Sequence, residues 1–194
     1  MLRIYTWSDY VKTELVQRFE RENACRVVIE TYDSNEAMYD HLVARDQEPF
    51  DLLFPSSYMV KILRDQGMLQ PLNPDWIPNR RNVDSAYLQR AFDRKMRHSV
   101  PYAVTVTSLG YLGEQVKDFK PTWAMLDRKD LKGRMTMLDD YRETIGAALK
   151  FLGYSLNSRD PKALEAARDV VIRWKKNLAK FENEQYKTGI ASGE

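Results

Sequence analysis

Four short clusters of polar and aromatic residues have the composition of a ligand-binding site. The first, Trp7-Ser8-Asp9-Tyr10, joins two aromatic rings to a hydroxyl and a carboxylate, whereas an ordinary loop would carry Gly, Asn or Pro. The others are Asp33-Ser34-Asn35-Glu36, Ser56-Ser57-Tyr58 and Asp139-Asp140-Tyr141-Arg142-Glu143. No catalytic set accompanies them: the sequence has no Gly-rich phosphate loop, no G-x-S-x-G and no His near a candidate nucleophile. The clusters therefore indicate binding, as at the lip of a cleft.

Each cluster follows a segment that we expect to be a strand. LRIYT (2–6) and RVVIETY (26–32) are β-prone, and DLLFP (51–55) is typical of a buried parallel strand. Helices are expected over about 10–23, 34–46 and 58–66, the second capped by Ser34 or Asn35 and the third ending at Gly67. This β-α-β-α-β-α order predicts an α/β fold with a parallel sheet, and such sheets bind ligands outside the carboxyl ends of their strands.

The second half of the sequence begins a new α/β unit. After an irregular Pro- and Asn-rich stretch and a short helix near Tyr87, the β-prone run 98–112 is expected to pass from one domain into the next. We therefore predict a first α/β lobe over 1–104 and a partial second lobe over 105–194. A strand over 133–138 and helices over about 140–152 and 161–181 are expected there. With only two expected strands, this half looks unfinished.

Structural roles compete with binding at these positions. The residues typical of helix N-caps are Ser8, Asp9, Ser34 and Ser56. Asp140 with Glu143 fits a capping box, and Trp7 and Tyr58 could be core aromatics. Capping and ligand contact are compatible, however, because both occur at junctions between strands and helices.

Composition excludes several classes of function. The 194 residues are 43% hydrophobic and 30% charged, as in soluble globular proteins, and the net charge of +2 gives no case for nucleic-acid binding. A single cysteine, Cys25, excludes an internal disulfide, and with only His41 and His98 beside it a zinc site is not expected. No apolar run could span a bilayer, and no signal segment opens the chain, which is compatible with a cytoplasmic location or with an export signal removed before Met1.

Several segments resemble the spermidine/putrescine-binding proteins, the extracytoplasmic solute receptors of polyamine ABC importers. They are IYTWSDYVKTELVQRFERE, TYDSNEAMYDHLVA, FDLLFPSSYMV, GMLQPLN, VPYAVTVTSLGYL and LDDYRETIGAALKFLGYSLNSRDP, in the family's order across nearly the whole chain. The resemblance implies a two-lobed, type II periplasmic-binding-protein fold that closes on a polyamine at the lobe interface. It also implies a membrane permease as partner, a periplasmic or extracytoplasmic location, with or without a lipid anchor, and no cofactor.

The resemblance assigns roles in the first lobe by position. Trp7 and Tyr10 would flank the methylene groups of the polyamine. Ser8 and Asp9 would line the same junction.

The remaining assignments concern the first-lobe wall and the second lobe. Ser56 and Tyr58 would line the first-lobe wall. Asp140 and Glu143 would be the second-lobe carboxylates that face an ammonium group. These types suit a polyamine, because methylenes pack on flat rings and ammonium groups prefer carboxylates and ring faces.

Members of the family continue well beyond the segment that resembles YKTGIASGE, so this chain corresponds to roughly their front half. We expect a fragment, a natural truncation, or a piece completed by another chain through homo-oligomerisation or swapping of elements. A monomer of the chain is expected to bind polyamine weakly, because closure between complete lobes would be compromised.

Other functions stay open at this point. A receptor of the same fold could bind another small cationic or polar solute, and type II binding folds also host enzymes, some with a cysteine nucleophile. Cys25 is the sole candidate nucleophile of that kind, and we interpret it as a partly buried structural thiol. A ligand-sensing regulator is a third alternative, but no helix-turn-helix or basic arm accompanies the domain.

Overall fold

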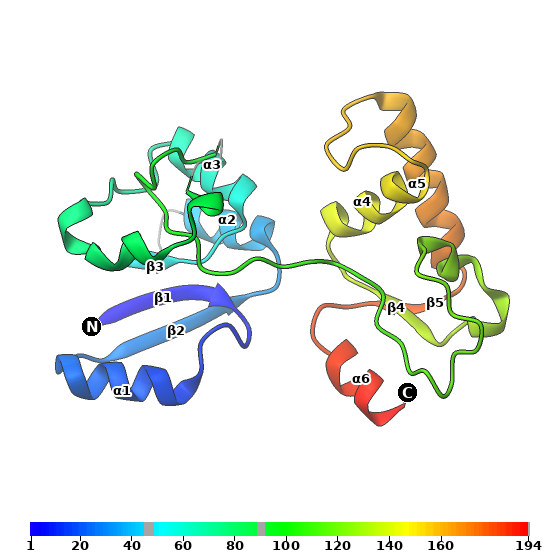
Figure 1. Ribbon diagram of the computed structural model, residues 1–194, viewed down its shortest axis with the longest axis horizontal. Helices are drawn as coiled ribbons and strands as arrows, with labels where there is room; N and C mark the ends of the chain where they lie inside the picture. The colour runs from blue at the N-terminus through cyan, green and yellow to red at the C-terminus, as the bar shows by residue number, and fades with distance from the viewer. Residues whose placement is uncertain (45–48, 89–91, 194) are drawn as a thin grey trace. The chain divides into compact units, whose positions relative to one another are not determined.

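The computed structural model describes residues 1–44, 49–88 and 92–193. The chain divides into two compact units, Met1–Val104 and Thr105–Glu194. Each unit contains its own parallel sheet and its own helices (Figure 1), so the two are described separately.

The first unit is built on a three-stranded parallel sheet, as the sequence predicts. Its strands are β1 (Leu2–Trp7), β2 (Val27–Tyr32) and β3 (Leu52–Leu53), in the order β2-β1-β3. β1 pairs with β2 along its whole length, so that Trp7 lies opposite Tyr32. Because all three strands run in the same direction, their carboxyl ends share one edge of the sheet.

Three helices alternate with these strands, which confirms the predicted β-α-β-α-β-α order. They are α1 (Thr13–Asn23), α2 (Asn35–Val43) and α3 (Ser57–Asp65). Ser34 caps α2 by accepting a hydrogen bond from the backbone N–H of Ala37, as expected for an N-cap serine. The last two residues expected in the second helix, 45 and 46, lie outside the described residues.

The start of α1 differs from the prediction. The helix begins at Thr13, and Lys12 occupies its N-cap position without a side-chain hydrogen bond. Asp9 has φ of 60°, a left-handed conformation that cannot continue a right-handed helix. The interpretation of Ser8 and Asp9 as N-caps is therefore wrong, and both residues belong to a turn between β1 and α1.

β3 is shorter and more exposed than the predicted buried strand over 51–55. It comprises only two residues, and Leu52 is 47% exposed. Among the described residues β3 pairs with β1 alone, so it is an edge strand with one covered side. The chain continues through three short 3₁₀ helices, Pro74–Trp76, Pro78–Asn82 and Ser85–Tyr87, and the last is the short helix expected near Tyr87.

The second unit has a two-stranded parallel sheet. The elements are the 3₁₀ helices Trp123–Asp127 and Lys129–Leu131, β4 (Met135–Met137), α4 (Tyr141–Phe151), α5 (Pro161–Lys175), β5 (Leu178–Phe181) and α6 (Tyr186–Ser192). β4 and β5 are parallel neighbours, and the sheet is as thin as the sequence predicts. One of its two strands, however, comes from an unexpected segment.

The helix predicted over 161–181 is wrong in its last part. α5 ends at Lys175, and the side-chain amide of Asn177 then donates to the carbonyl of Leu126 at 2.9 Å, after which the chain enters β5. Leu178 and Phe181 extend the helical spacing of apolar residues, but a segment this short fits a strand equally well. Neither β5 nor α6 was predicted.

The β-prone run over 98–112 forms no strand in the described structure. Val104 and Val106 are 66% and 84% exposed, and no described strand pairs with the run. Its composition favours a strand, but an extended segment needs a neighbour to complete its hydrogen bonds.

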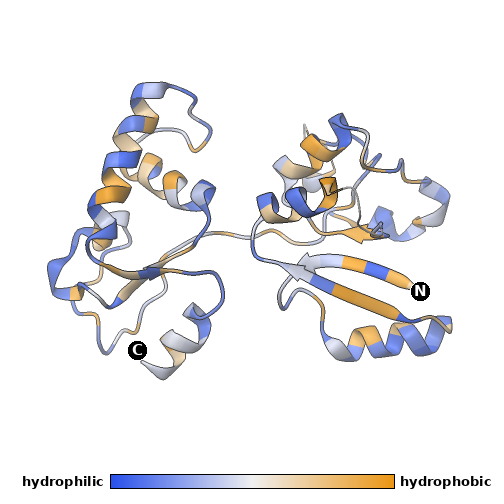
Figure 2. Cartoon of the chain, turned by 180° about the vertical axis from the view of Figure 1, so that it is seen from behind, coloured by the Kyte–Doolittle hydropathy of each residue, from blue (hydrophilic) through white to orange (hydrophobic). Residues whose placement is uncertain are grey.

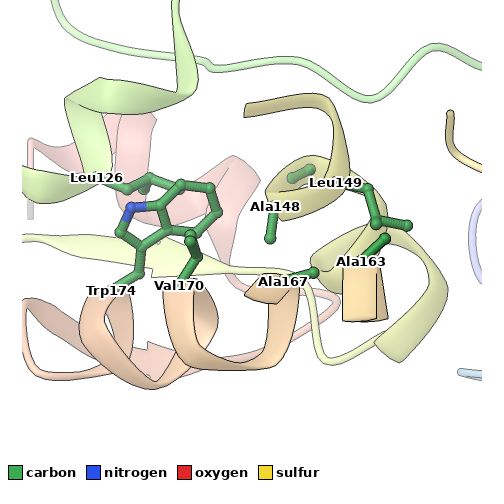
Figure 3. Close-up of a cluster of buried hydrophobic side chains, with 8 residues drawn as sticks. Leu126, Ala148, Leu149, Ala163, Ala167, Val170 and Trp174 are labelled. Carbon is green, nitrogen blue, oxygen red and sulfur yellow. The ribbon is translucent and has the colours of Figure 1, made fainter. Parts of the chain in front are cut away.

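Each unit has a hydrophobic core of its own. The buried cluster of the first unit is Tyr5, Tyr32, Met38, Met59 and Leu63. Figure 2 shows that β2 begins with a hydrophobic stretch, which a hydrophilic residue follows. In the second unit the fully buried Trp174 packs with small residues of α4 and α5, including Ala148 and Ala167 (Figure 3). Close packing of this kind fixes the strands and helices whose ends carry the polar clusters.

Candidate ligand-binding site

The carboxyl ends of all three strands in the first unit meet at one backbone carbonyl. The carbonyl oxygen of Phe54, directly after β3, accepts hydrogen bonds from Trp7 Nε1 at 3.0 Å and from the Tyr32 hydroxyl at 2.6 Å. The rings of Trp7 and Tyr32 pack edge to face with their centroids 4.7 Å apart. Trp7 is therefore held in one orientation while it remains only half-buried.

A second group of rings extends this edge of the sheet. The Tyr102 hydroxyl donates to the carbonyl of Tyr10 at 2.7 Å, and the two ring centroids are 6.0 Å apart. Tyr102 also packs edge to face with Phe54, at 5.0 Å, and Tyr10 lies 6.4 Å from Trp7. Because Tyr102 is 61% exposed, the structure presents an accessible aromatic wall made by Trp7, Tyr10, Phe54 and Tyr102.

Sequence reasoning missed three of these aromatic residues. Tyr32 ends β2 and belongs to the core, Phe54 acts through both its carbonyl and its ring, and Tyr102 lies in the β-prone run that was expected to pass between the domains. The position of Tyr32 at a strand end could have signalled its role. Tyr102 could not have been found in this way, because its neighbours lie far away in the sequence.

Ser8 and Asp9 fill the turn between the aromatic residues Trp7 and Tyr10. Ser8 is half-buried, whereas Asp9 is exposed. The positive φ of Asp9 places its backbone in the left-handed conformation. Aspartate tolerates this conformation better than most residues do. The turn thus places a hydroxyl and a carboxylate in the same stretch as the two rings.

The second and third clusters of the first unit are tied to each other. The buried Asn35 donates from Nδ2 to Ser56 Oγ at 3.0 Å and accepts from the Ser56 backbone N–H at 2.9 Å. The Tyr58 hydroxyl donates to Glu36 at 3.0 Å. Ser56 occupies the N-cap position of α3, but its side chain makes no capping hydrogen bond. Its hydroxyl instead accepts from Asn35, and this bond connects the segment after β2 with the segment after β3.

The buried phenol of Tyr32 does not ionise in the physiological pH range. Burial raises the pKa of the Tyr32 phenol far above its ordinary value, and the neighbouring Tyr10, Tyr5 and Tyr58 raise it further. The Tyr32 hydroxyl stays neutral at physiological pH and acts as a hydrogen-bond donor rather than as an acid or base.

The second unit presents carboxylates at the start of α4. Asp140 caps this helix, since its Oδ1 accepts from the backbone N–H groups of Arg142 at 2.8 Å and Glu143 at 3.0 Å. Among the described residues no hydrogen bond reaches the other oxygen, Oδ2. The exposed Glu143 accepts from the hydroxyl of Thr107 at 2.6 Å. Capping thus uses half of the Asp140 carboxylate and leaves the other half available.

The unpredicted strand β5 brings a further polar loop beside Asp139 and Asp140. Asn183 accepts from the backbone N–H of Asp139 at 2.9 Å and donates to its carbonyl at 3.1 Å. Glu182 donates its backbone N–H to the carbonyl of Met137 at the end of β4, and its side chain accepts from Glu184. As in the first unit, the carboxyl ends of two parallel strands hold a polar cluster.

Each unit by itself offers groups of a kind that can bind an organic cation. Exposed rings attract methylene groups and positive charge, and the carboxylates of the second unit attract ammonium groups. In the described part of the chain, no group of three or more His, Cys, Asp or Glu residues is arranged to hold a metal ion. Cys25, the one free thiol, is half-buried, as we expected.

The chain matches a family model described as bacterial extracellular solute-binding protein over residues 14–194. It is 35% identical over 194 residues to the spermidine/putrescine-binding periplasmic protein of Escherichia coli K12, covering 100% of this chain and 56% of the relative. It is 33% identical to the putrescine/cadaverine-binding protein of Pseudomonas aeruginosa, covering 95% and 54% of the two chains.

Among solved structures, the chain resembles the Tp0655 (TpPotD) lipoprotein of Treponema pallidum. The TM-score is 0.90 at 36% identity, and the match covers 99% of this chain and 60% of that one. The chain therefore spans a little over half the length of the relatives that it matches.

Proposed function

Because the chain belongs to the bacterial extracellular solute-binding protein family, we propose that it binds polyamines, spermidine or putrescine, as the receptor component of an ABC importer. The resemblance seen in the sequence is confirmed, and so is the fold class, part of a type II periplasmic-binding-protein fold. The observation that carries the proposal is the accessible aromatic wall at the strand ends of the first unit.

In this proposal the first unit holds the hydrocarbon part of the ligand. Trp7 and Tyr10 pack against the methylene groups, and the exposed ring of Tyr102 extends the same surface. The hydrogen bond from Trp7 Nε1 to Phe54 supports this role, because a ring fixed before binding loses little conformational entropy on binding.

Polar residues of the first unit contribute orientation and charge. Asp9 is the exposed carboxylate beside the rings, with Ser8 lining the same turn. Ser56 and Tyr58 line the wall, and their bonds to Asn35 and Glu36 support a second role in holding the β2 and β3 junctions together.

The second unit, taken by itself, carries carboxylates that suit an ammonium group. Oδ2 of Asp140 is the leading acceptor, since Oδ1 alone serves the helix cap. Glu143 is the second carboxylate, oriented by its hydrogen bond from Thr107. Hydrogen bonds to charged groups contribute about 1.5–3 kcal/mol each, which is enough to select a cation over a neutral solute.

We assign the chain no catalytic role, and its relatives are named as binding proteins. The partners in the proposal are the polyamine and the membrane permease of the importer. The location is extracytoplasmic, in line with the periplasmic relative and the lipoprotein of similar structure. Across the described residues, none of the helices has both the length and the hydropathy that a membrane span requires.

Isothermal titration calorimetry with a matched pair of ligands tests the proposal. Putrescine and 1,4-butanediol have the same four-carbon chain, but the diol carries no charge. We expect spermidine and putrescine to bind saturably and the diol to give no saturable heat, because the carboxylates recognise ammonium groups. Equal binding of diol and diamine, or no saturable binding of either polyamine to folded protein, would contradict the proposal.

Association between copies of the chain is part of the same proposal. No residue of α1 is buried, and its apolar side chains Leu15 and Phe19 are 55% and 43% exposed, so a second copy would cover them. Light scattering on the titrated sample supports association if the mass exceeds the 22.8 kDa of one chain. A mass of one chain removes this part of the proposal and leaves polyamine binding standing.

A further inference from the structure

A cavity of about 350 Å³ lies in the first unit, apart from the strand ends. Its lining residues are Arg64, Asp93, Arg94, Arg97 and His98. Arg64 lies in the last turn of α3, whereas Ser56 precedes the first turn of the same nine-residue helix. At a helical rise of 1.5 Å per residue, the eight residues from Ser56 to Arg64 separate the two positions by about 12 Å. None of the residues that line this cavity belongs to the candidate polyamine site.

Asp93 does not offer its carboxylate to a cation in this cavity. It is 5% exposed, and its two oxygens accept from the backbone N–H groups of Arg97, His98 and Ser99 at 2.7–3.2 Å and from the Ser99 hydroxyl at 2.7 Å. Although burial acts to raise the pKa of Asp93, these hydrogen bonds hold it below its usual range. The ionised carboxylate thus holds the backbone of residues 97–99 in place through these hydrogen bonds.

The loop that carries the arginines is held in an unusual conformation. Lys95 and Met96 are consecutive non-glycine residues with φ of 68° and 49°. Met96 is buried, and its backbone N–H donates to the carbonyl of Asp93 at 3.3 Å. Such conformations are costly, and they cluster at ligand sites, where the surrounding structure maintains them.

Positive charge dominates the cavity wall. Arg64 is paired with Asp65 at 2.6 Å and also donates to the carbonyl of Phe92. Arg94 and Arg97 are exposed, and no hydrogen bond or ion pair joins either side chain to another described residue. Because the carboxylate of Asp93 is directed to its own loop, two guanidinium groups remain available to a ligand.

We propose that this cavity binds a small oxoanion of the phosphate type. Arg94 and Arg97 would hold the oxygens, since a guanidinium group presents parallel N–H donors that match phosphate geometry. Arg64 and His98 complete the wall. The volume lies within the range of pockets that hold small ligands, and it exceeds what a single phosphate needs.

Titration of the chain with inorganic phosphate tests this proposal. Calorimetry is run at constant ionic strength, adjusted with sodium chloride, without polyamine. We expect saturable binding at one site per chain, and a dissociation constant at least tenfold higher in the double variant Arg94→Gln/Arg97→Gln. The control is Arg80→Gln/Arg81→Gln, in the 3₁₀ helix Pro78–Asn82, which removes the same charge outside the cavity and should change the constant less than twofold.

Two results would overturn the phosphate site. One is the absence of saturable phosphate binding to the folded wild-type chain. The other is equal weakening in the two double variants, which would mean that phosphate responds to net charge rather than to this cavity. Spermidine titrations of the same proteins report separately on the polyamine proposal, because neither Arg94 nor Arg97 belongs to that candidate site.

Discussion

Trp7→Ala is expected to raise the dissociation constant for spermidine by about thirtyfold. A desolvated cation over an aromatic face contributes roughly 2 kcal/mol, and each 1.4 kcal/mol corresponds to a factor of ten in affinity. The substitution also removes the hydrogen bond from Trp7 Nε1 to Phe54, which joins the ends of β1 and β3. Calorimetry on the wild type and the variant measures the change, and circular dichroism establishes that both are folded.

Trp7→Phe distinguishes the contribution of the aromatic ring to binding from that of the hydrogen bond that Trp7 Nε1 donates. Phenylalanine keeps an aromatic face beside Tyr32 but cannot donate to the carbonyl of Phe54. We therefore expect a loss of affinity several times smaller than for alanine. If alanine and phenylalanine weaken binding equally, the ring face of Trp7 does not contact the ligand, and its role is only to hold the strand ends together.

Asp140→Asn is expected to raise the dissociation constant for spermidine by about ten- to a hundredfold. Loss of a hydrogen bond to a charged group costs about 1.5–3 kcal/mol, and the variant removes the charge that attracts the ammonium group. Asparagine is as good an N-cap as aspartate, so it can still accept from the N–H groups of Arg142 and Glu143. The stability of α4 should therefore change little while binding weakens.

Asp160→Asn is the matched control in the same unit. Asp160 caps α5 by accepting from the backbone N–H of Lys162 at 3.0 Å, and it belongs to none of the candidate clusters. The same substitution there should leave spermidine affinity within twofold of the wild type. Equal effects at Asp140 and Asp160 would show that net charge, rather than a contact at the start of α4, determines the affinity.

The sequence was sufficient to predict β1, β2 and α4, the elements beside Trp7, Tyr10 and Asp140. β1 and β2 are compact runs of apolar and β-branched residues, so both the strands and their parallel order could be inferred from composition and chain order. The polar clusters follow directly in the sequence. For that reason Trp7, Tyr10 and Asp140 could be selected before any contact was known.

Contacts between distant segments could not be predicted in the same way. Tyr102 meets Tyr10 and Phe54 only because the chain returns to the sheet, and the run around Tyr102 gave a misleading strand signal. The hydrogen bond that Asn35 donates to the hydroxyl of Ser56 likewise could be seen only in the folded unit. Local pattern predicts which residues stand at a strand end, but pairing across the sheet decides how their polar atoms are used.

The most direct test of polyamine binding follows the four tryptophan indole N–H signals by ¹H–¹⁵N NMR while spermidine is added. Trp7→Phe identifies the Trp7 signal. We predict that this signal shifts progressively and saturates, whereas the signal of Trp174, fully buried in the core of the second unit, stays in place. Saturation with an unmoved Trp7 signal, or no change in any of the four, would contradict the account.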